Sequence, residues 1–317
     1  DATLPVRAGD RVVNLTEQTP PRTAADVVGA GGVFLETSAT PDYVQRQRDV
    51  IAKSGGTGVL VDCVGLAPGL TNLMAHAVMA RSQSVSALEI AGELGLGKHA
   101  GPGATKWFVE SLGKLYTATV EGRAQQYFPG QQQSKIQFNA SEASRLTLGF
   151  PFVEQSVLAT EFAGRAETVL SYLAFAPPFV TTFLALLLRC GVGGLAARHA
   201  DFVSRLLLKF PEIGSMSTRI VVRATPADGG DPLVLCFETG DQTPATAAIV
   251  AAVALAPLPK PRDGSLLTIV DLLTLGDALA AVRKVHPGSN LEGTAVPGGI
   301  PIHSINDDTR SFVEHGT

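Results

Sequence analysis

The sequence predicts an α/β protein whose N-terminal part builds a parallel sheet and whose middle part is an α+β unit. Three observations support this prediction. Strand and helix patterns alternate from Arg11 to Val61, and the last strand of this run passes through a glycine-proline turn into an apolar helix. Beyond Met79 the alternation stops and strands mix with helices in a different order, which indicates a second folding unit.

The first region is expected to contain three strands linked by two helices. Short apolar runs of this kind are typical of parallel strands, which are covered on both faces. The helical connections suit right-handed crossovers between parallel neighbours. The predicted strands cover residues 11–15, 33–35 and 59–61, and the predicted helices cover residues 24–29 and 42–53.

A glycine-proline junction follows the third predicted strand. Gly65, Pro68 and Gly69 end the strand, and Thr71 or Asn72 could cap the helix over residues 73–79. Open α/β sheets bind ligands at such junctions, where free N–H groups of the helix face a crevice. An ordinary strand-to-helix turn without a ligand fits the same residues, and both interpretations stay open.

The second region is predicted from local patterns alone. A strand is expected over residues 86–92, a glycine-rich loop over 95–103, a helix over 105–115, and strands near 133–139 and 146–149.

A helical block is expected over residues 169–210, followed by a hairpin and an alanine-rich helix. The hairpin pairs residues 218–224 with 233–239 across Asp228-Gly229-Gly230, and the helix covers 243–255. The most apolar stretch, 173–188, is too short for a membrane span, so we expect a buried helix that begins at the pair Pro177-Pro178.

Composition excludes several classes of protein. The chain has 317 residues, 45% of them hydrophobic, a net charge of -4 and scattered basic residues, which argues against a nucleic-acid partner. Its three cysteines are widely spaced and have no neighbouring histidine, so neither a disulfide framework nor a metal site is expected. Since the chain does not open with a signal-peptide pattern, we expect a cytoplasmic protein without a membrane partner.

Several segments carry a resemblance to a known family. NLTEQTPP, GGVFLETSATPDYV and VGLAPGLTNLMAHAVM, in this order, resemble the second half of the nucleotide-binding domain of saccharopine dehydrogenase-like NAD(P)-dependent oxidoreductases. ELGLGKHAGPGATKW and FETGDQTPATAAIVAAVAL resemble the second domain of that family and its returning helix. The resemblance implies a partial Rossmann-like domain over residues 1–80, an α+β substrate and dimerisation domain over 81–240, and a returning helix with a C-terminal tail over 241–317.

The resemblance also implies NADP or NAD as cofactor, a small-molecule substrate and a homodimer. The sequence departs from the family in one respect, because it has no G-x-G-x-x-G turn to hold the pyrophosphate. Neither residues 29–32 nor 92–97 have that spacing. Two explanations fit this truncated pattern: a fragment of a longer oxidoreductase, or a shortened relative that uses the fold for another purpose.

Site residues are transferred from the resemblance position by position. At Glu36 many relatives have an aspartate that faces the substrate, so the longer side chain alters that implied contact. Saccharopine-type enzymes have an acidic residue at the position of Ala67 and often an imidazole at that of Asn72, and these two changes argue against saccharopine itself as the substrate. The implied cofactor-binding residues are Asn14, Leu15, Thr16, Glu17, Gly65, Pro68 and Gly69, and the implied substrate-binding residues are Glu36, Thr37, Ser38, Asn72 and Asp241.

His99 is the predicted proton donor. Hydride reduction of an imine or ketone needs such a donor, and a histidine titrates in the useful range, while Lys98 could orient an anionic substrate. A glycine loop whose histidine touches only solvent is the alternative. The start of the alanine-rich helix likewise has two interpretations: Asp241 or Thr243 could cap it, or Asp241 and Gln242 could face the interdomain cleft.

The predicted function is therefore NAD(P)-dependent hydride transfer to or from a C=N or C=O bond of a small amino-acid-like metabolite. The activity of this chain is in question without the G-x-G-x-x-G segment. A non-catalytic ligand-binding or dimerisation module derived from the same fold is the alternative.

Overall fold

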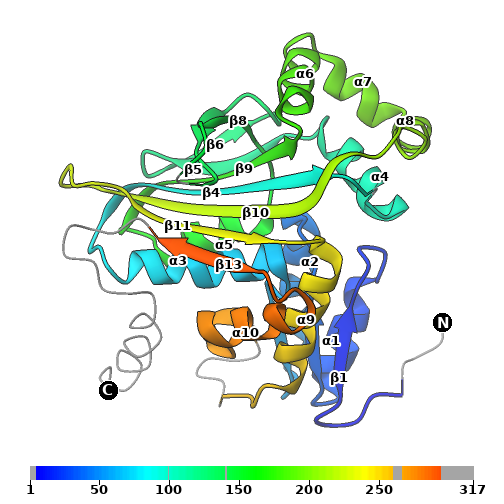
Figure 1. Cartoon of the computed structure of the whole chain (residues 1–317). Helices are drawn as coiled ribbons and strands as arrows, with labels where there is room; N and C mark the ends of the chain where they lie inside the picture. Colours follow the sequence, from blue (N-terminus) through cyan, green and yellow to red (C-terminus); the bar gives the residue numbers. More distant parts are fainter. Residues whose placement is uncertain (1–4, 99, 140, 260–265, 294–317) are drawn as a thin grey trace.

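The computed structural model describes residues 5–98, 100–139, 141–259 and 266–293. Within this part of the chain, two sheets are stacked with helices between them (Figure 1). One sheet is small and parallel, and the other is larger and mixed. The protein is thus an α/β protein, as the alternating pattern predicts.

The small sheet has the strand order β1-β2-β3-β12. Strands β1 (Arg11–Asn14), β2 (Val33–Glu36) and β3 (Val59–Asp62) are parallel neighbours, which confirms the predicted strands to within one residue. Strand β12 (Leu266–Thr268) was not predicted. Its three residues are too few to show a pattern, and they lie far along the chain from their partner β3.

Helices α1 (Pro21–Gly29) and α2 (Pro41–Ser54) cover one face of the small sheet. Both begin earlier than predicted because a proline suits the first helical position. Gly58 is required where β3 begins, since a Cβ there would lie 2.2 Å from the carbonyl oxygen of Gly32. The apolar residues of this layer are Ala24, Val27, Val28, Phe34, Ile51 and Leu60.

The large sheet is built around two long parallel strands, β4 (Val85–Leu96) and β9 (Ala166–Ala176). Strand β10 (Ile213–Pro226) pairs with β4, and β11 (Leu233–Thr239) pairs with β10, in the register predicted for the hairpin. Strand β13 (Asn290–Gly293) adds to the edge beyond β11.

Beyond β9 the sheet continues into short hairpins, β5 (Tyr116–Val120) with β6 (Arg123–Tyr127) and β7 (Gln133–Ile136) with β8 (Arg145–Gly149). The predicted helical block over 169–210 is wrong in its first part, because those residues belong to β9. An apolar run of this kind suits a buried strand as well as a helix, and pairing with β4 decides for the strand.

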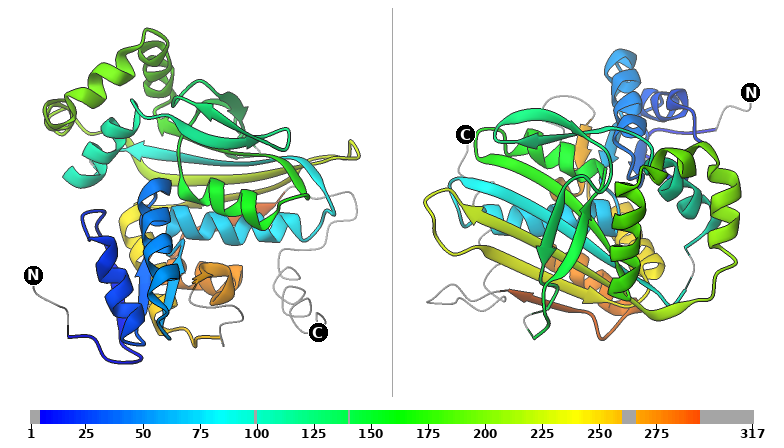
Figure 2. Two further views of the ribbon diagram at one scale, coloured as in Figure 1. Left: turned by 180° about the vertical axis from the view of Figure 1, so that it is seen from behind. Right: turned by 90° about the horizontal axis from the view of Figure 1, so that it is seen from above.

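Helix α3 (Thr71–Met79) lies between the two sheets together with α5 (Val153–Glu161) (Figure 2). Eight of its nine residues are buried. Helices α9 (Gln242–Leu255) and α10 (Leu275–Val285) complete this layer. The main core joins all layers and includes Leu35, Val61, Met74, Leu88, Ile220, Phe237, Ile249 and Val282.

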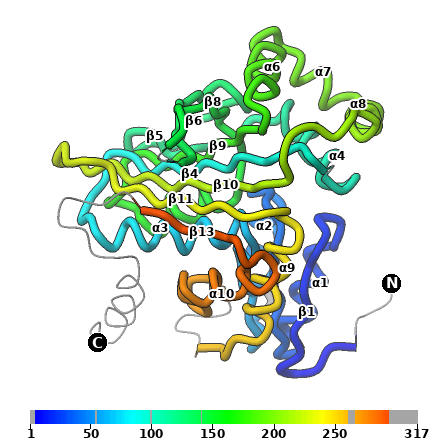
Figure 3. The backbone as a smooth tube through the Cα atoms, viewed as in Figure 1, coloured from blue at the N-terminus to red at the C-terminus, as the bar shows by residue number. Residues whose placement is uncertain are grey.

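The remaining helices stand at one end of the large sheet, as the backbone trace in Figure 3 shows. They are α4 (Pro102–Ser111), α6 (Pro178–Arg189), α7 (Val192–Arg198) and α8 (Ala200–Leu207). Helix α6 begins at the proline pair as predicted, but the prediction that it is buried is wrong. Phe179 and Phe183 are 64% and 60% exposed, because α6 packs against β8 and β9 with one side only.

Glu154, in the first turn of α5, is completely buried in the layer between the sheets. Its Oε2 atom has no hydrogen-bond partner among the described residues. Burial disfavours the charged form and raises the pKa of Glu154 to about 8, against an ordinary value of 4.5. Between these two pKa values the folded protein holds a proton that the unfolded chain has released.

The first prediction concerns the pH dependence of stability that this bound proton causes. The free energy of unfolding contributed by Glu154 should fall as the pH rises from about 4.5 to 8. Replacing Glu154→Gln should therefore stabilise the protein at pH 8 by on the order of 1 to 3 kcal/mol. Urea unfolding at pH 5 and pH 8 measures the difference, with the exposed Glu167→Gln as the matched control. Equal stability of Glu154→Gln and the native chain at pH 8 would contradict the prediction.

Candidate functional site

The carboxyl ends of β1 and β2 carry a buried polar network. Asn14 donates from Nδ2 to Glu36 Oε2 at 2.7 Å and to the Tyr43 hydroxyl at 3.1 Å. The Tyr43 hydroxyl donates to the Thr19 carbonyl at 2.8 Å, and the Ser38 N–H donates to Glu36 Oε1 at 2.8 Å. The structure thus brings together Asn14, Glu36 and Ser38, which the resemblance assigns to cofactor and substrate.

Glu36 is turned inward at this edge. Its side chain is fully buried, and burial raises its pKa, although hydrogen bonds from Ser38, Asn14 and Gln47 work in the opposite direction. Both carboxylate oxygens bind groups of the same sheet edge. Glu36 therefore holds the ends of β1 and β2 together.

The loop after β1 reaches the second unit through a chain of hydrogen bonds. Thr40 donates from Oγ1 to Glu17 Oε2 at 2.7 Å, and Trp107 of α4 donates from Nε1 to Thr40 Oγ1 at 2.5 Å. Next to this chain, Thr37 donates to the Asn14 carbonyl at 2.7 Å, and Leu15 is 75% exposed. Sequence analysis missed Trp107 because its partner lies 67 positions away.

Asp62 ends β3 and lies among buried groups. Its Oδ2 accepts from Arg48 Nε at 2.5 Å, whereas Oδ1 has no partner within the described part of the chain. Burial raises the pKa of Asp62 to about 6, and the Arg48 guanidinium opposes part of this shift. Burial also raises the pKa of the neighbouring Cys63 thiol well above its ordinary value. Both groups therefore favour their neutral forms more than an exposed group would.

The glycine junction after β3 is packed against its own protein. A Cβ on Gly69, whose φ is +135°, would lie 2.8 Å from the Cys63 carbonyl oxygen, and one on Gly65 would lie 3.0 Å from the Pro68 carbonyl oxygen. Pro68 is buried in the same turn, η1 (Leu66–Leu70). Close packing of the backbone therefore explains the two glycines without a ligand.

The proposed caps of α3 are corrected by the structure. The helix begins at Thr71, so Thr71 and Asn72 lie inside its first turn, and the preceding Leu70 makes no side-chain cap. Asn72 accepts a hydrogen bond from the Gly69 N–H at 3.0 Å. Its side chain therefore fastens the turn to the helix.

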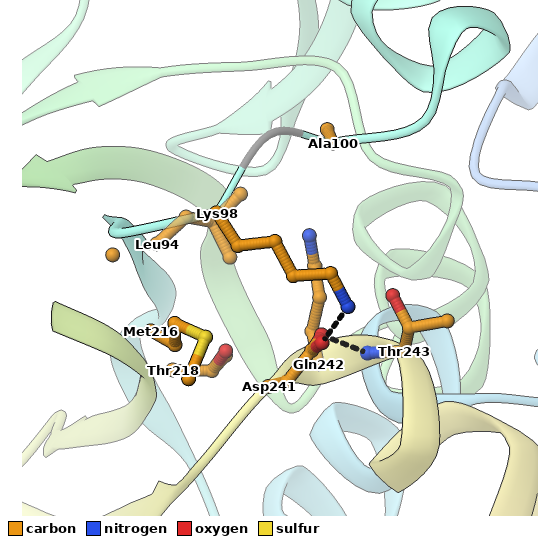
Figure 4. A pocket seen from close by; sticks show the side chains of 9 residues that line it. Leu94, Lys98, Ala100, Met216, Thr218, Asp241, Gln242 and Thr243 are labelled. Atoms are coloured by element: carbon orange, nitrogen blue, oxygen red, sulfur yellow. Dashed lines mark hydrogen bonds and ion pairs between the residues drawn. The ribbon is translucent and has the colours of Figure 1, made fainter. Parts of the chain in front are cut away.

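A small open pocket lies at the end of the large sheet, where α9 begins (Figure 4). It encloses about 30 Å³. Strands β4 and β11 run in the same direction with β10 between them, so Lys98 after β4 and Asp241 after β11 reach one edge. The lining residues are Leu94, Gly95, Lys98, Ala100, Met216, Thr218, Asp241, Gln242 and Thr243.

Lys98 and Asp241 form an ion pair across the pocket, with 2.6 Å between Nζ and Oδ2. The hydrogen bond to Asp241 raises the pKa of Lys98. Burial opposes the charged form of Asp241, but hydrogen bonds from Lys98 and from the Thr243 N–H lower its pKa on balance. Both groups are therefore charged at neutral pH.

Asp241 combines the two roles considered for it. Its Oδ1 accepts from the Thr243 N–H at 2.9 Å and so caps α9, while its Oδ2 faces Lys98 in the pocket. The other predicted member of this site, His99, lies outside the described residues. Its neighbours Lys98 and Ala100 both line the pocket.

The pocket offers charges of both signs to a ligand. The Lys98 ammonium and the N-terminus of α9 suit a carboxylate, and the Asp241 carboxylate suits an ammonium group. The side chain of Lys98 is 55% exposed, so a ligand can reach it from solvent.

The described residues do not fit the pyrophosphate of a nicotinamide dinucleotide. The turns after β1 and β2 contain no glycine, and the glycines of the turn after β3 are occupied by contacts within the protein. Within the described ranges, no group of three or more His, Cys, Asp or Glu residues could hold a metal ion.

No protein-family model matches this chain. No curated protein matches it either. Among solved structures, the chain is similar to apo saccharopine dehydrogenase (L-Glu forming) from Saccharomyces cerevisiae, at 12% identity, with 90% of this chain and 85% of that chain covered and a TM-score of 0.49.

Two further similar structures are provisionally assigned as oxidoreductases. The one from Bacteroides fragilis is 11% identical, with 80% of this chain and 58% of that chain covered and a TM-score of 0.25. The one from Bacillus subtilis is 9% identical, with 87% and 77% covered and a TM-score of 0.28. Likenesses of this extent do not establish an activity.

The second prediction concerns the link between the sheet edge and α4. Replacing Thr40→Val removes the acceptor of Trp107 and the side-chain donor to Glu17 while keeping the shape of the side chain. We expect the free energy of unfolding to fall by about 1 to 2 kcal/mol. Urea unfolding followed by the fluorescence of Trp107, the single tryptophan, measures this. Thr182→Val, at an exposed position of α6, should leave the stability unchanged.

Proposed function

We propose that this protein is an NAD(P)-dependent oxidoreductase of the saccharopine dehydrogenase-like type. Its substrate would be a small amino-acid-like metabolite with a C=N or C=O bond. The observation that supports this most is the Lys98–Asp241 pair, since two residues assigned to catalysis and substrate meet in one accessible pocket. The order of the family-like segments along the chain supports it independently.

The pocket suits a zwitterionic metabolite for an electrostatic reason. In the free protein Lys98 and Asp241 neutralise each other. A ligand with a carboxylate and an ammonium group would replace this single ion pair with two, one to each side chain. A ligand of one charge would leave either Lys98 or Asp241 without its partner.

The cofactor is supported by the sequence resemblance alone. The described residues supply no turn for a pyrophosphate, so we assign no step of the reaction to them through the cofactor. The proposed domains remain residues 1–80, 81–240 and 241–317. The proposed assembly remains a homodimer, and the proposed cofactor remains NADP or NAD.

The contacts of the protein with its own glycine junction after β3 favour a second function. Because Gly65 and Gly69 contact protein atoms, the same fold could serve as a non-catalytic ligand-binding module that uses only the Lys98 pocket. Cofactor binding separates the two proposals, since a ligand that binds only the folded state must raise the melting temperature.

The third prediction tests the cofactor. For an oxidoreductase we expect a cooperative melt whose midpoint rises in millimolar NADPH or NADH, and isothermal titration should then give a stoichiometric binding curve. ADP-ribose serves as a matched probe that lacks the nicotinamide. If the protein melts cooperatively and none of the three compounds raises its melting temperature, the oxidoreductase proposal is rejected and the binding-module proposal remains.

The fourth prediction tests the pocket itself. L-glutamate has both charges, and 2-oxoglutarate lacks the ammonium group. We expect Lys98→Met to weaken the binding of both compounds by about tenfold or more, and Asp241→Asn to weaken only that of glutamate. Lys106→Met is the matched control, because Lys106 is also an exposed lysine paired with an aspartate, at 2.6 Å from Asp201. Thermal shift and isothermal titration measure these affinities. Equal losses in the Lys106 variant would contradict the assignment of the pocket.

A further inference from the structure

Helices α6, α7 and α8 expose an unusual number of large apolar side chains. Phe179, Phe183 and Phe202 are 64%, 60% and 70% exposed. We call the following exposed set the apolar patch: Phe179, Phe183, Leu186, Leu195, Phe202, Leu206 and Phe210.

These helices differ from an ordinary surface helix in having apolar side chains on the outward face as well. Helix α6 buries Thr181 and Ala185, α7 buries Gly193, and α8 buries Ala200 and Ser204. The fit at Gly193 is close, because a Cβ there would lie 2.7 Å from the Leu112 carbonyl oxygen. Leu184 and Leu188 of α6 also pack against the protein, but all three helices carry large apolar side chains on their outward faces, which folding alone does not require.

The apolar patch lies on a projecting part of the molecule. Helices α6, α7 and α8 stand at one end of the large sheet, away from the small sheet and α10 (Figures 1 and 2). The Lys98 pocket lies at the same end of the large sheet but is lined by residues outside the patch. The patch and the pocket therefore share no residue.

The segment that contains the apolar patch, residues 177–211, has a net charge opposite in sign to that of the whole chain. Residues 177–211 contain four cationic side chains, Arg189, Arg198, Arg205 and Lys209, although the whole chain has a net charge of -4. All four are exposed. The single carboxylate of the segment, Asp201, pairs with Lys106 of α4 at 2.6 Å. Basic groups therefore predominate around the patch, with the exposed Glu212 just beyond Phe210.

We propose that the apolar patch docks onto the surface of a bilayer that contains anionic phospholipids. Phenylalanine and leucine side chains would enter the boundary between headgroups and acyl chains, and the basic groups would contact lipid phosphates. This inference is independent of the proposed function, and it replaces the expectation that the protein has no membrane partner.

The geometry favours helices lying on the bilayer over a helix crossing it. None of the described helices is by itself long and apolar enough to span a membrane. Helices α6 and α7 reach that length and composition together, but they meet at an angle of 92°. Three short helices joined by sharp bends suit an interfacial position.

Charge disfavours a second copy of this chain as the occupant. A two-fold contact would bring each patch against an identical one and place the cations of both copies in one interface. The segment has no unpaired carboxylate to offset them, since Asp201 pairs with Lys106. An anionic lipid surface supplies the opposite charge.

Vesicle flotation tests the proposal. The native chain should float with vesicles of phosphatidylcholine mixed with phosphatidylglycerol, and less so with phosphatidylcholine alone or at high salt. The double variant Phe183→Ser, Phe202→Ser should lose at least about tenfold in vesicle affinity. The double variant Leu255→Ser, Leu266→Ser is the matched control, because these leucines are 85% and 48% exposed outside the patch.

A charge-reversal variant, a check of folding and a measurement of oligomeric state complete the test. Arg198→Glu with Arg205→Glu should reduce binding to the anionic vesicles and leave binding to neutral ones unchanged. Circular dichroism melts should show that every variant remains folded. Three outcomes would overturn the proposal: no flotation of the native chain, equal losses in the leucine control, or a dimer in sedimentation equilibrium that the phenylalanine variant dissociates while vesicle binding is absent.

Discussion

The burial of helix α3 at eight of its nine residues is the constraint on which the structure depends. The helix contacts both sheets and the neighbouring helices, so it must enter the interior directly from the end of β3. That entry leaves no room for side chains at Gly65 and Gly69, and Asn72 fastens the turn from within the helix. The feature that most resembles a ligand site in the sequence is therefore a closely packed turn inside the protein.

The same packing determines where ligands can reach the protein. Asn14, Glu36 and Asp62 end their strands with buried side chains that bind neighbouring protein groups. Polar groups remain accessible where α9 begins, at the point where Lys98 meets Asp241. A metabolite would thus be recognised by the edge of the large sheet, and the small sheet would serve as its support.

Two surfaces at the same end of the large sheet have different chemistry. The Lys98 pocket is polar and small, and the apolar patch of α6, α7 and α8 is large and surrounded mainly by basic groups. If the patch rests on anionic lipid, the pocket opens close to the bilayer surface. A metabolite with a charged head would then be presented near the membrane, which links the two proposals without making one depend on the other.

Local patterns in the sequence determined the elements whose signals lie within a few residues. These include the first three strands, the hairpin of β10 with β11, and Asp241 as the cap of α9. Lys98 and Asp241 were also expected, but their contact across 143 positions follows only from the register of β4, β10 and β11. Tertiary structure alone decided that Ala166–Ala176 is a strand, that Glu36 points inward, that Trp107 binds Thr40, and that α6 faces outward. In each of these cases the deciding partner is distant in sequence, so periodicity and propensity contain no information about it.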